Sequence, residues 1–377
     1  MKVTYISSSI IPSRTANSIH VMKVCQAFSE LGHEVTLLAP DVKANYEKDI
    51  TDIYEFYGTS NIFNIAKLPW LTYLKGTSLF YGFFAALKSH RMNADLVFCR
   101  DFHGAFFASL MGKKVVYESH TPICDSNARG LKPSMFRSMI SKENFKNLVV
   151  ITHSLKAYYL AHFPQLKGKI IVAADGADPI APDTEPFDFK NDKSRMQVGY
   201  VGHLYPGRGV DIIIELASMC DWADFHIIGG QESDINYWKA LSNDLSNVTF
   251  HGFVSPSEAE RMRMGCEVLL APYQASVAVS GGGGNTVKWM SPLKVFEYMA
   301  AGKAILSSDI PVLHEVLQDK KNSLLCIADQ PVDWAEKLIT LRDNPALKQT
   351  LGESALKDFV SSYSWYSRVN NIMNEIH

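Results

Sequence analysis

The chain has 377 residues, 47% of them hydrophobic, and this length favours two domains over one hydrophobic core. Its formal net charge of -2 argues against a nucleic-acid partner. The six cysteines stand singly, without the close pairs of a zinc or thiol-exchange site, so a reducing, cytoplasmic location is the simplest interpretation.

The N-terminal residues run directly into a strand pattern at Val3–Ser7, without the apolar core of a secretory signal, so we expect the protein to stay in the cytoplasm. No stretch reaches the roughly 18 uninterrupted apolar residues that predict a membrane span. The nearest, Ile62–Leu87, is rich in Phe, Tyr and Leu but contains Lys67 and Pro69. Its favoured interpretation is a buried helix with a connecting loop. The alternative is a surface that contacts a lipid-linked molecule or the membrane interface.

Short β-branched runs alternate with amphipathic segments along the chain, which predicts parallel sheets flanked by helices. A helix after the first strand is expected to be capped by Asn17-Ser18 and to end at Gly32. The strands predicted in the first half are Val3–Ser7, Glu34–Ala39, Asp95–Cys99, Lys114–Glu118, Leu148–Thr152 and Lys169–Ala173.

From Asp175 to Ser194 this periodicity fails, and prolines lie among acidic residues as in a linker. We therefore predict an N-terminal domain at residues 1–178 and a C-terminal domain at residues 190–362. A last helix at residues 363–377 is expected to pack back on the first domain. The strands predicted in the second domain are Gln197–Val201, Asp224–Ile228, Val248–Phe250, Glu267–Ala271, Ala304–Ser307 and Ser323–Cys326.

The first candidate site residue is His120, which follows a predicted strand in the segment Glu118-Ser119-His120. Open parallel sheets bind ligands at the carboxyl ends of their strands, so His120 is expected to point at a cleft. A single histidine in such a place is otherwise more often structural.

A glycine-rich turn follows the first strand of the second domain, from Gly202 through Gly207 to Arg208. Glycines let backbone N–H groups approach a ligand, and Arg208 stands just before a helix start, so the turn predicts an anion site. Its spacing fits neither a Walker loop nor the dinucleotide fingerprint, which disfavours an ATPase or an NAD enzyme. The alternative is an ordinary strand–helix turn with an exposed arginine.

The most informative segment runs from Ser291 to Gly302, with Ser291 as the expected helix N-cap and Pro292 at the first helical position. Lys294 then lies in the first turn, where the helix dipole disfavours a cation, and such a conflict is expected where a phosphate binds. Glu297 projects from nearly the same face and could accept hydrogen bonds from both hydroxyls of a ribose. The alternative is a solvent-exposed Lys–Glu pair.

These segments resemble the retaining glycosyltransferases of the GT-B fold, and specifically glycosyltransferase family 4, over nearly the whole chain. The resemblance implies an α/β protein of two Rossmann-like domains whose parallel sheets face each other across a cleft. The first domain would bind the acceptor and the second the nucleoside-diphosphate sugar. The matching segments are Asn17-Ser18-Ile19-His20, Glu118-Ser119-His120, Gly202 to Arg208, and Pro292 to Gly302 with the following Lys303 to Ser308.

The resemblance also implies residue roles. Arg208 and Lys294 would bind the phosphates, and with His120, which would contact the donor sugar, they are the candidate catalytic residues. The acceptor would lie near Asn17 and Ser18, where the family usually has paired glycines. The residues expected to bind the donor are Gly202, His203, Arg208, Pro292, Leu293, Lys294 and Glu297.

Trp289 stands where the family's Glu-x7-Glu motif has its first carboxylate, so the donor sugar cannot be inferred from better-marked members. The implied reaction is hexosyl transfer from a UDP- or GDP-sugar to a carbohydrate, lipid-linked or small-molecule hydroxyl, in surface polysaccharide, glycolipid or glycoconjugate biosynthesis. We expect no metal and no cofactor, because fixed cations and N–H groups would stabilise the leaving diphosphate. The open alternatives are a sugar-nucleotide epimerase of the same fold and a non-catalytic sugar-binding protein.

Overall fold

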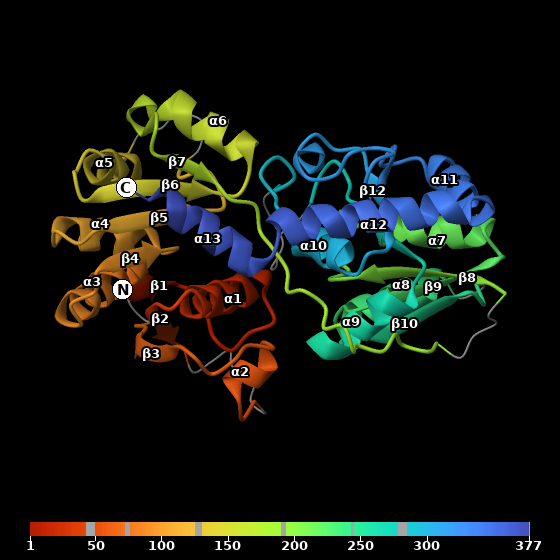
Figure 1. Ribbon diagram of the computed structural model, residues 1–377, viewed down its shortest axis with the longest axis horizontal. Coiled ribbons are helices and arrows are strands. Elements are labelled where there is room, and N and C mark those ends of the chain that lie inside the picture. Colours follow the sequence, from red (N-terminus) through yellow and green to blue (C-terminus); the bar gives the residue numbers. More distant parts are fainter. Residues whose placement is uncertain are drawn as a thin grey trace. The chain divides into compact units, whose positions relative to one another are not determined.

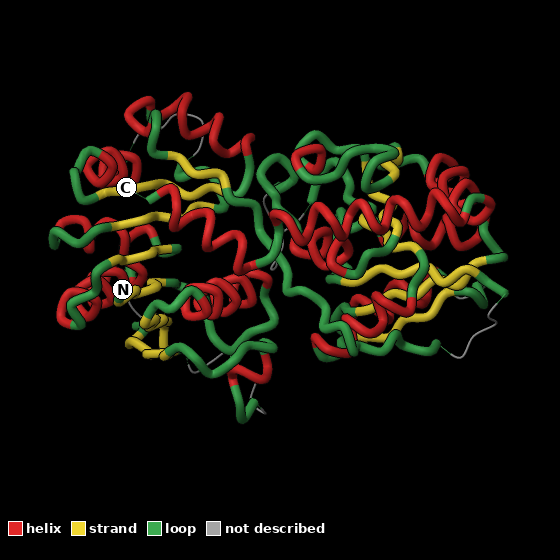
Figure 2. Tube along the Cα trace, viewed as in Figure 1, coloured by secondary structure: helices red, strands yellow, loops and turns green. Residues whose placement is uncertain are grey.

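A computed structural model describes residues 1–42, 50–71, 76–124, 130–189, 194–242, 245–277 and 285–376. The chain folds into two compact units (Figure 1). Unit 1 comprises Met1–Asp175 and Trp365–His377, and unit 2 comprises Gly176–Ser364. Figure 2 shows that each unit has strands side by side with helices around them.

Unit 1 is built on a seven-stranded parallel sheet with the strand order β3-β2-β1-β4-β5-β6-β7. Because β2 and β4 flank β1, the direction of strand progression reverses there, as in Rossmann-like sheets. The central strands β1, β4 and β5 are buried almost throughout, as expected where helices cover both faces of a sheet. The strands are β1 (Lys2–Ile6), β2 (Glu34–Asp41), β3 (Asn64–Pro69), β4 (Leu96–Cys99), β5 (Val115–Ser119), β6 (Phe145–Val150) and β7 (Ile170–Val172).

The C-terminal helix α13 (Trp365–Glu375) belongs to unit 1, where it packs on α1 (Ala16–Glu30). Its buried face includes Arg368, Val369 and Ile372. The other helical segments of this unit are α2 (Ile53–Phe56), α3 (Thr77–Arg91), α4 (Phe102–Leu110), α5 (Leu131–Ile140), α6 (His153–His162) and the 3-10 turn at Pro164–Leu166.

The structure corrects two predictions in unit 1. Within Ile62–Leu87, predicted as a buried helix with its loop, Asn64–Pro69 forms the edge strand β3, and the helix α3 leaves several large apolar side chains exposed. The N-cap of α1 is Thr15 rather than Asn17-Ser18, because the Thr15 hydroxyl accepts a hydrogen bond from the Ser18 N–H at 3.3 Å. The predicted end of α1 at Gly32 is confirmed by its left-handed φ of 81°.

Unit 2 repeats the same arrangement with a six-stranded parallel sheet in the order β10-β9-β8-β11-β12-β13. Here the strand order reverses at β8. All strands predicted for both halves are present, although the ends of several shift. The strands are β8 (Met196–Val201), β9 (Ala223–Ile228), β10 (Val248–Gly252), β11 (Val268–Ala271), β12 (Ala304–Ser308) and β13 (Leu324–Cys326).

The core of unit 2 lies between this sheet and its helices, and the fully buried Trp334 is its largest side chain. Residues 176–178, predicted to end the first domain, belong to unit 2, where Ala177 pairs with Ser364. The helical segments are α7 (Val210–Met219), α8 (Glu232–Leu241), α9 (Pro256–Gly265), α10 (Leu293–Ala300), the 3-10 turn Leu313–Glu315, α11 (Pro331–Asp343) and α12 (Pro345–Ser362). Among all helices in the described part of the chain, none is both long enough and apolar enough to cross a membrane.

Candidate active site

In unit 2, a tight glycine turn follows β8 at the point where the strand order reverses. Gly202, Gly207 and Gly209 have positive φ angles of 149°, 84° and 76°, which other residues rarely adopt. A side chain at Gly207 would also clash with the backbone of Ser276, and one at Gly209 with that of Pro272. The turn therefore packs directly against the chain that follows β11, and ligands of open α/β sheets bind at this kind of edge.

Two predicted cations, Lys294 and Arg208, converge beside this turn. The Lys294 Nζ lies 3.8 Å from the ring centroid of Tyr200 and 4.8 Å from that of Tyr273. The Arg208 guanidinium carbon lies 5.6 Å from the same Tyr273 ring. Lys294 is only 7% exposed, and its ammonium has no hydrogen-bond partner among the residues that the structure describes.

The electrostatics of this pair favour an anionic ligand. Burial lowers the pKa of Lys294 well below its usual value, and the charge of Arg208 lowers it further, whereas Glu297 acts in the opposite direction. A buried cation without a partner is costly, and an anion bound beside it would remove much of that cost. The same forces act on His203, since burial and then Arg208 lower its pKa. Its ring stacks on Tyr205 with the centroids 4.8 Å apart.

The helix that carries Lys294 begins differently from the prediction. Pro292, not Ser291, is the N-cap of α10, and no side chain caps the helix. Leu293 and Lys294 are therefore the first two helical residues, and helices leave the N–H groups of their first turn without an intrahelical acceptor. Proline at the cap offers no competing side-chain acceptor. A helix start of this kind is a position at which a phosphate can bind.

Glu297 forms an ion pair that the sequence did not predict. Its Oε2 lies 3.3 Å from Nη1 of Arg263, a residue of α9 that is only 8% exposed. The alternative of a solvent-exposed pair between Lys294 and Glu297 is wrong, because Lys294 is buried and Glu297 pairs with Arg263. No local pattern marked Arg263, which resembles any arginine of a polar helix. The pair orients the Glu297 carboxylate, which stays one-third exposed.

In unit 1, His120 follows β5 and is held from both sides. Its Nε2 lies 2.8 Å from Oε1 of Glu118, and its Nδ1 lies 3.0 Å from Nη2 of Arg100. Because arginine only donates and a carboxylate only accepts, the ring carries its hydrogen on Nε2 and is neutral. Burial and the charge of Arg100 agree with this assignment, because they lower the pKa of His120 to about 4.

The buried Glu118 of β5 joins residues from distant parts of unit 1. Its Oε1 accepts a hydrogen bond from Nη2 of Arg368 at 2.6 Å and lies 2.9 Å from Nε2 of His20. The Tyr5 hydroxyl donates to its Oε2 at 3.4 Å. Burial alone would raise the pKa of Glu118, but Arg368 and then His20 hold it well below its usual range. Sequence reasoning gave no role to Arg368, which α13 brings to this position.

His20 lies between two carboxylates, because its Nδ1 is 2.9 Å from Oδ1 of Asp175. Among the residues that the structure describes, His20, His120 and Asp175 form a group whose ligand atoms lie within 4.8 Å of one another, close enough to hold a metal ion. Arg100 and Arg368 border the same group, however, and would repel a cation. We therefore interpret the group as a network of hydrogen bonds and ion pairs.

The predicted acceptor residues Asn17 and Ser18 differ in their surroundings. Ser18 is fully buried, and its hydroxyl donates to the carbonyls of Ser13 and Thr15 at 2.7 and 2.9 Å. It supports the loop before α1, so the expected contact of its side chain with an acceptor has no support. Asn17 is exposed, and its carbonyl accepts a hydrogen bond from Arg100 at 3.3 Å. Arg100 thus links Asn17 to His120.

The predicted site residues therefore form two groups. Unit 1 holds His120 with Asn17 and Ser18 nearby. Unit 2 holds the glycine turn, the two cations and the start of α10, with Glu297 one turn further along. Those of unit 2 are Gly202, His203, Arg208, Pro292, Leu293, Lys294 and Glu297.

Two family models match the chain. The model described as Glycosyltransferase Family 4 matches residues 18–179, and the model described as Glycosyl transferases group 1 matches residues 195–344. The uncharacterized glycosyltransferase MJ1178 of Methanocaldococcus jannaschii is 30% identical over 175 residues, which are 44% of this chain and 43% of that protein. A second protein of the same organism, the uncharacterized glycosyltransferase MJ1069, is 22% identical over 398 residues. The match covers 98% of this chain and 96% of MJ1069.

Solved structures share the fold over the full length. Anabaena Alr3699/HepE in complex with UDP and glucose superposes with a TM-score of 0.71 at 12% identity, covering 99% of this chain and 98% of that one. A glycosyltransferase from Rickettsia africae superposes with a TM-score of 0.73 at 12% identity, covering 99% and 97%. These likenesses confirm the expected GT-B fold with its two Rossmann-like domains.

Proposed function

The chain belongs to glycosyltransferase family 4, and from that premise we propose that it moves a sugar from a nucleoside diphosphate to an acceptor hydroxyl with retention of anomeric configuration. HepE was solved with UDP and glucose, which supports a UDP-sugar as the first donor to test here. We propose a carbohydrate or lipid-linked hydroxyl as the acceptor, in surface polysaccharide, glycolipid or glycoconjugate biosynthesis.

One observation carries this proposal: the convergence of Lys294 and Arg208 on Tyr273 beside the glycine turn. Within the described part of the chain the buried Lys294 ammonium has no hydrogen-bond partner, so its burial has a cost that a bound anion would reduce. A diphosphate fits this position because it offers several acceptor oxygens to a helix start, a lysine and an arginine together. Glu297, oriented by Arg263, is proposed to accept hydrogen bonds from the ribose hydroxyls.

In the proposed reaction the bond between the anomeric carbon and the diphosphate oxygen breaks, and the sugar passes through an oxocarbenium-like state. Lys294, Arg208 and the N–H groups at the start of α10 stabilise the charge that develops on the leaving diphosphate. The acceptor oxygen forms its new bond on the face that the diphosphate leaves, and its proton passes to the departing phosphate oxygen. The protein then needs neither a strong base nor a metal ion.

His120 is proposed to act as a neutral group near the donor sugar. Both of its ring nitrogens are engaged in the structure, one with Glu118 and one with Arg100. A hydrogen bond from the sugar to Nδ1 therefore requires that Arg100 release it. Arg100 also contacts the carbonyl of Asn17, so the same movement would change the proposed acceptor side.

Incubation with donors and acceptors tests the function directly. The first experiment measures the Tm of the protein with UDP, GDP and their sugar conjugates. We expect UDP-sugars to raise the Tm, since a ligand at 100 times its Kd stabilises the folded protein by about 2.7 kcal/mol. The best donor is then incubated with and without acceptor, and the anomeric proton couplings of the product are read by NMR. Conversion of the donor without acceptor would indicate an epimerase, and the lack of any nucleotide-induced shift would indicate a protein of another kind.

A further inference from the structure

Helix α3 of unit 1 presents large apolar side chains to solvent over two successive turns. The exposed fractions are 39% for Leu79, 46% for Phe80, 39% for Phe83 and 49% for Phe84. Soluble proteins rarely expose several large apolar side chains side by side unless the patch binds something. We call the exposed face of α3, together with the groove beside it, the α3 surface.

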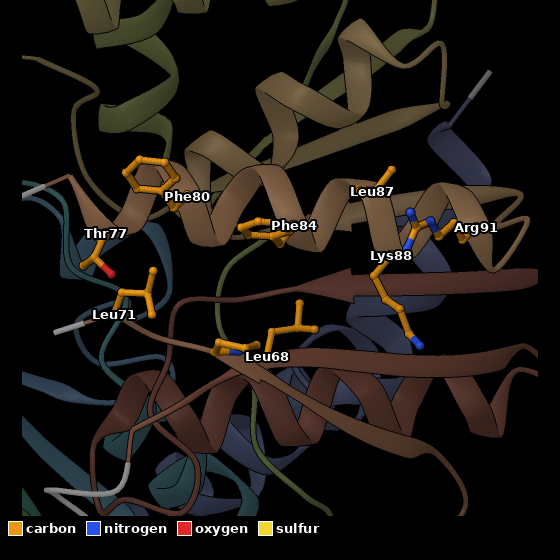
Figure 3. A pocket seen from close by; sticks show the side chains of 9 residues that line it. Leu68, Leu71, Thr77, Phe80, Phe84, Leu87, Lys88 and Arg91 are labelled. Carbon is orange, nitrogen blue, oxygen red and sulfur yellow. The ribbon is translucent and has the colours of Figure 1, made fainter. Parts of the chain in front are cut away.

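A groove runs beside α3, between the helix and the residues at the end of β3 (Figure 3). Phe80, Phe84 and Leu87 approach it from the helix, and Leu68 lies on the opposite side. Its volume of about 230 Å³ is below the size of most pockets that enclose a whole small molecule. A short length of hydrocarbon chain suits its size and its apolar walls. The full lining is Leu68, Pro69, Leu71, Thr77, Phe80, Phe84, Leu87, Lys88 and Arg91.

Positive charge borders the apolar part of this groove. Lys88 and Arg91 lie in the last turn of α3, and both are exposed. From Phe56 to Ala94 the sequence contains no Asp or Glu, whereas the whole chain carries a slight excess of them. Among the described residues that line the groove, Lys88 and Arg91 are charged and none is acidic, which favours an anionic partner.

We propose that the α3 surface docks on an anionic phospholipid bilayer, with the exposed Phe side chains at the acyl boundary and Lys88 and Arg91 at the lipid phosphates. Interfacial helices combine these features: aromatic and aliphatic residues on one face, and Lys and Arg whose stems pass along apolar surface to the headgroups. The groove would receive part of one acyl chain. A second copy of the chain fits less well, since a symmetric contact would bring the same cations together.

This inference is independent of the proposed reaction, because bilayer docking requires no donor or acceptor. The test is flotation of the full chain with vesicles of phosphatidylglycerol and phosphatidylcholine, compared with vesicles of phosphatidylcholine alone. We expect binding to the anionic vesicles only, and weaker binding as the salt rises from about 0.1 M to about 0.5 M, because salt screens surface charge.

Two double variants separate the apolar and the cationic parts of the surface. Phe80→Ser with Phe84→Ser, and Lys88→Glu with Arg91→Glu, are each expected to reduce vesicle binding by at least about tenfold. All four side chains are exposed, and the charge reversal tests the proposal even if the Phe variant folds poorly. The matched control is Lys357→Glu with Val360→Ser on α12, where Val360 is 65% exposed.

The proposal is overturned if the chain does not bind anionic vesicles, or if both α3 variants bind as tightly as the α12 control. Sedimentation equilibrium of the same proteins provides a further test. If the chain forms dimers that the α3 variants abolish, and vesicle binding is absent, the surface is a self-association interface and the bilayer proposal fails.

Discussion

The guanidinium of Arg368 lies 2.6 Å from the carboxylate of Glu118, although 250 residues separate them in the chain. The contact joins the last helix to the central sheet of unit 1, and both side chains are almost completely buried. Arg368 also donates to the carbonyl of Ala174 at 2.8 Å. Because Glu118 contacts both His20 and His120, Arg368 acts on the candidate site through Glu118 and is a positioning residue.

Arg368→Ala is expected to lower the free energy of unfolding by about 3–5 kcal/mol, because it leaves the Glu118 carboxylate buried without its main counter-charge. Urea unfolding of the purified variant measures this loss. Arg342→Ala provides the control, since Arg342 pairs with Asp343 at the surface, where solvent screens the charges and removal of such a pair costs little. Equal losses in the two variants would contradict the role given to Arg368.

The Arg368 contact also shows where sequence reasoning ends. Alternating runs predicted the parallel strands of both sheets except β3, and Lys294 was found because a cation at a helix start breaks a local rule. The glycine turn and Arg208 were likewise visible within a few residues of sequence. Arg368 carries no such mark, because a single arginine in an amphipathic C-terminal helix resembles any surface arginine until the fold places Glu118 beside it.

The wrong predictions have equally local causes. The run that contains β3 is rich in aromatic and aliphatic residues, and a short apolar run fits a buried helix as well as a strand. Ser18 looked like a cap because serine often is one, but Thr15, three residues earlier, provides the cap hydroxyl. For Glu297, the alternative interpretation paired it with Lys294 of its own helix. Its partner in the structure is Arg263 of α9, which no sequence spacing relates to it.

Lys294→Met is expected to make the protein more stable and nearly inactive. Lys294 is a buried ammonium that has no hydrogen-bond partner among the described residues, and its removal is expected to raise the free energy of unfolding by about 1–4 kcal/mol. The gain should be largest at low pH, where the wild-type lysine is charged in the folded and unfolded states. It should vanish above pH 10.5, the ordinary pKa of lysine, where the side chain is neutral in both. Urea unfolding at several pH values measures it.

Transfer by the Lys294 variant is expected to fall about 10²–10³-fold, the usual effect of losing one group that stabilises developing negative charge. Arg208→Ala should behave similarly. Lys357→Met, at an exposed position of α12, is the control and should change neither stability nor rate. Near-normal transfer by both site variants would refute the phosphate-binding roles, even if Lys294→Met were more stable.

Binding of UDP is expected to be accompanied by proton uptake at Lys294. Burial lowers the pKa of Lys294 in the free protein, and a neighbouring diphosphate would raise it again. At a pH between the pKa of the free protein and that of the complex, Lys294 therefore takes up a proton when UDP binds. Calorimetry in buffers of different ionisation enthalpy measures the uptake at about pH 8, above the titration of the terminal phosphate and below that of the uracil N–H. In Lys294→Met the buffer dependence should disappear. Release of protons by the wild-type protein would contradict the assigned position of the diphosphate.

Transfer is expected to continue undiminished in excess EDTA. Lys294 and Arg208 already supply the positive charge that a metal ion would bring to the leaving diphosphate. In the described part of unit 1, His20, His120 and Asp175 are close enough to hold a metal, but Arg100 and Arg368 border them and oppose a cation. The assay compares initial rates with EDTA alone and with added Mg²⁺ or Mn²⁺.

The variant His20→Gln tests whether the group of His20, His120 and Asp175 is responsible for any effect of EDTA on activity. If the group works as a hydrogen-bonded network, His20→Gln should change activity equally with EDTA and with added metal, because His20 then acts through Glu118 and Asp175 alone. Loss of wild-type activity in EDTA, with recovery on metal addition, would overturn the metal-independent mechanism. If His20→Gln then needs a higher metal concentration for activity than the wild type, the imidazole is part of a metal site. Even the loss of a residue that only orients a ligand weakens metal binding about 10–100-fold.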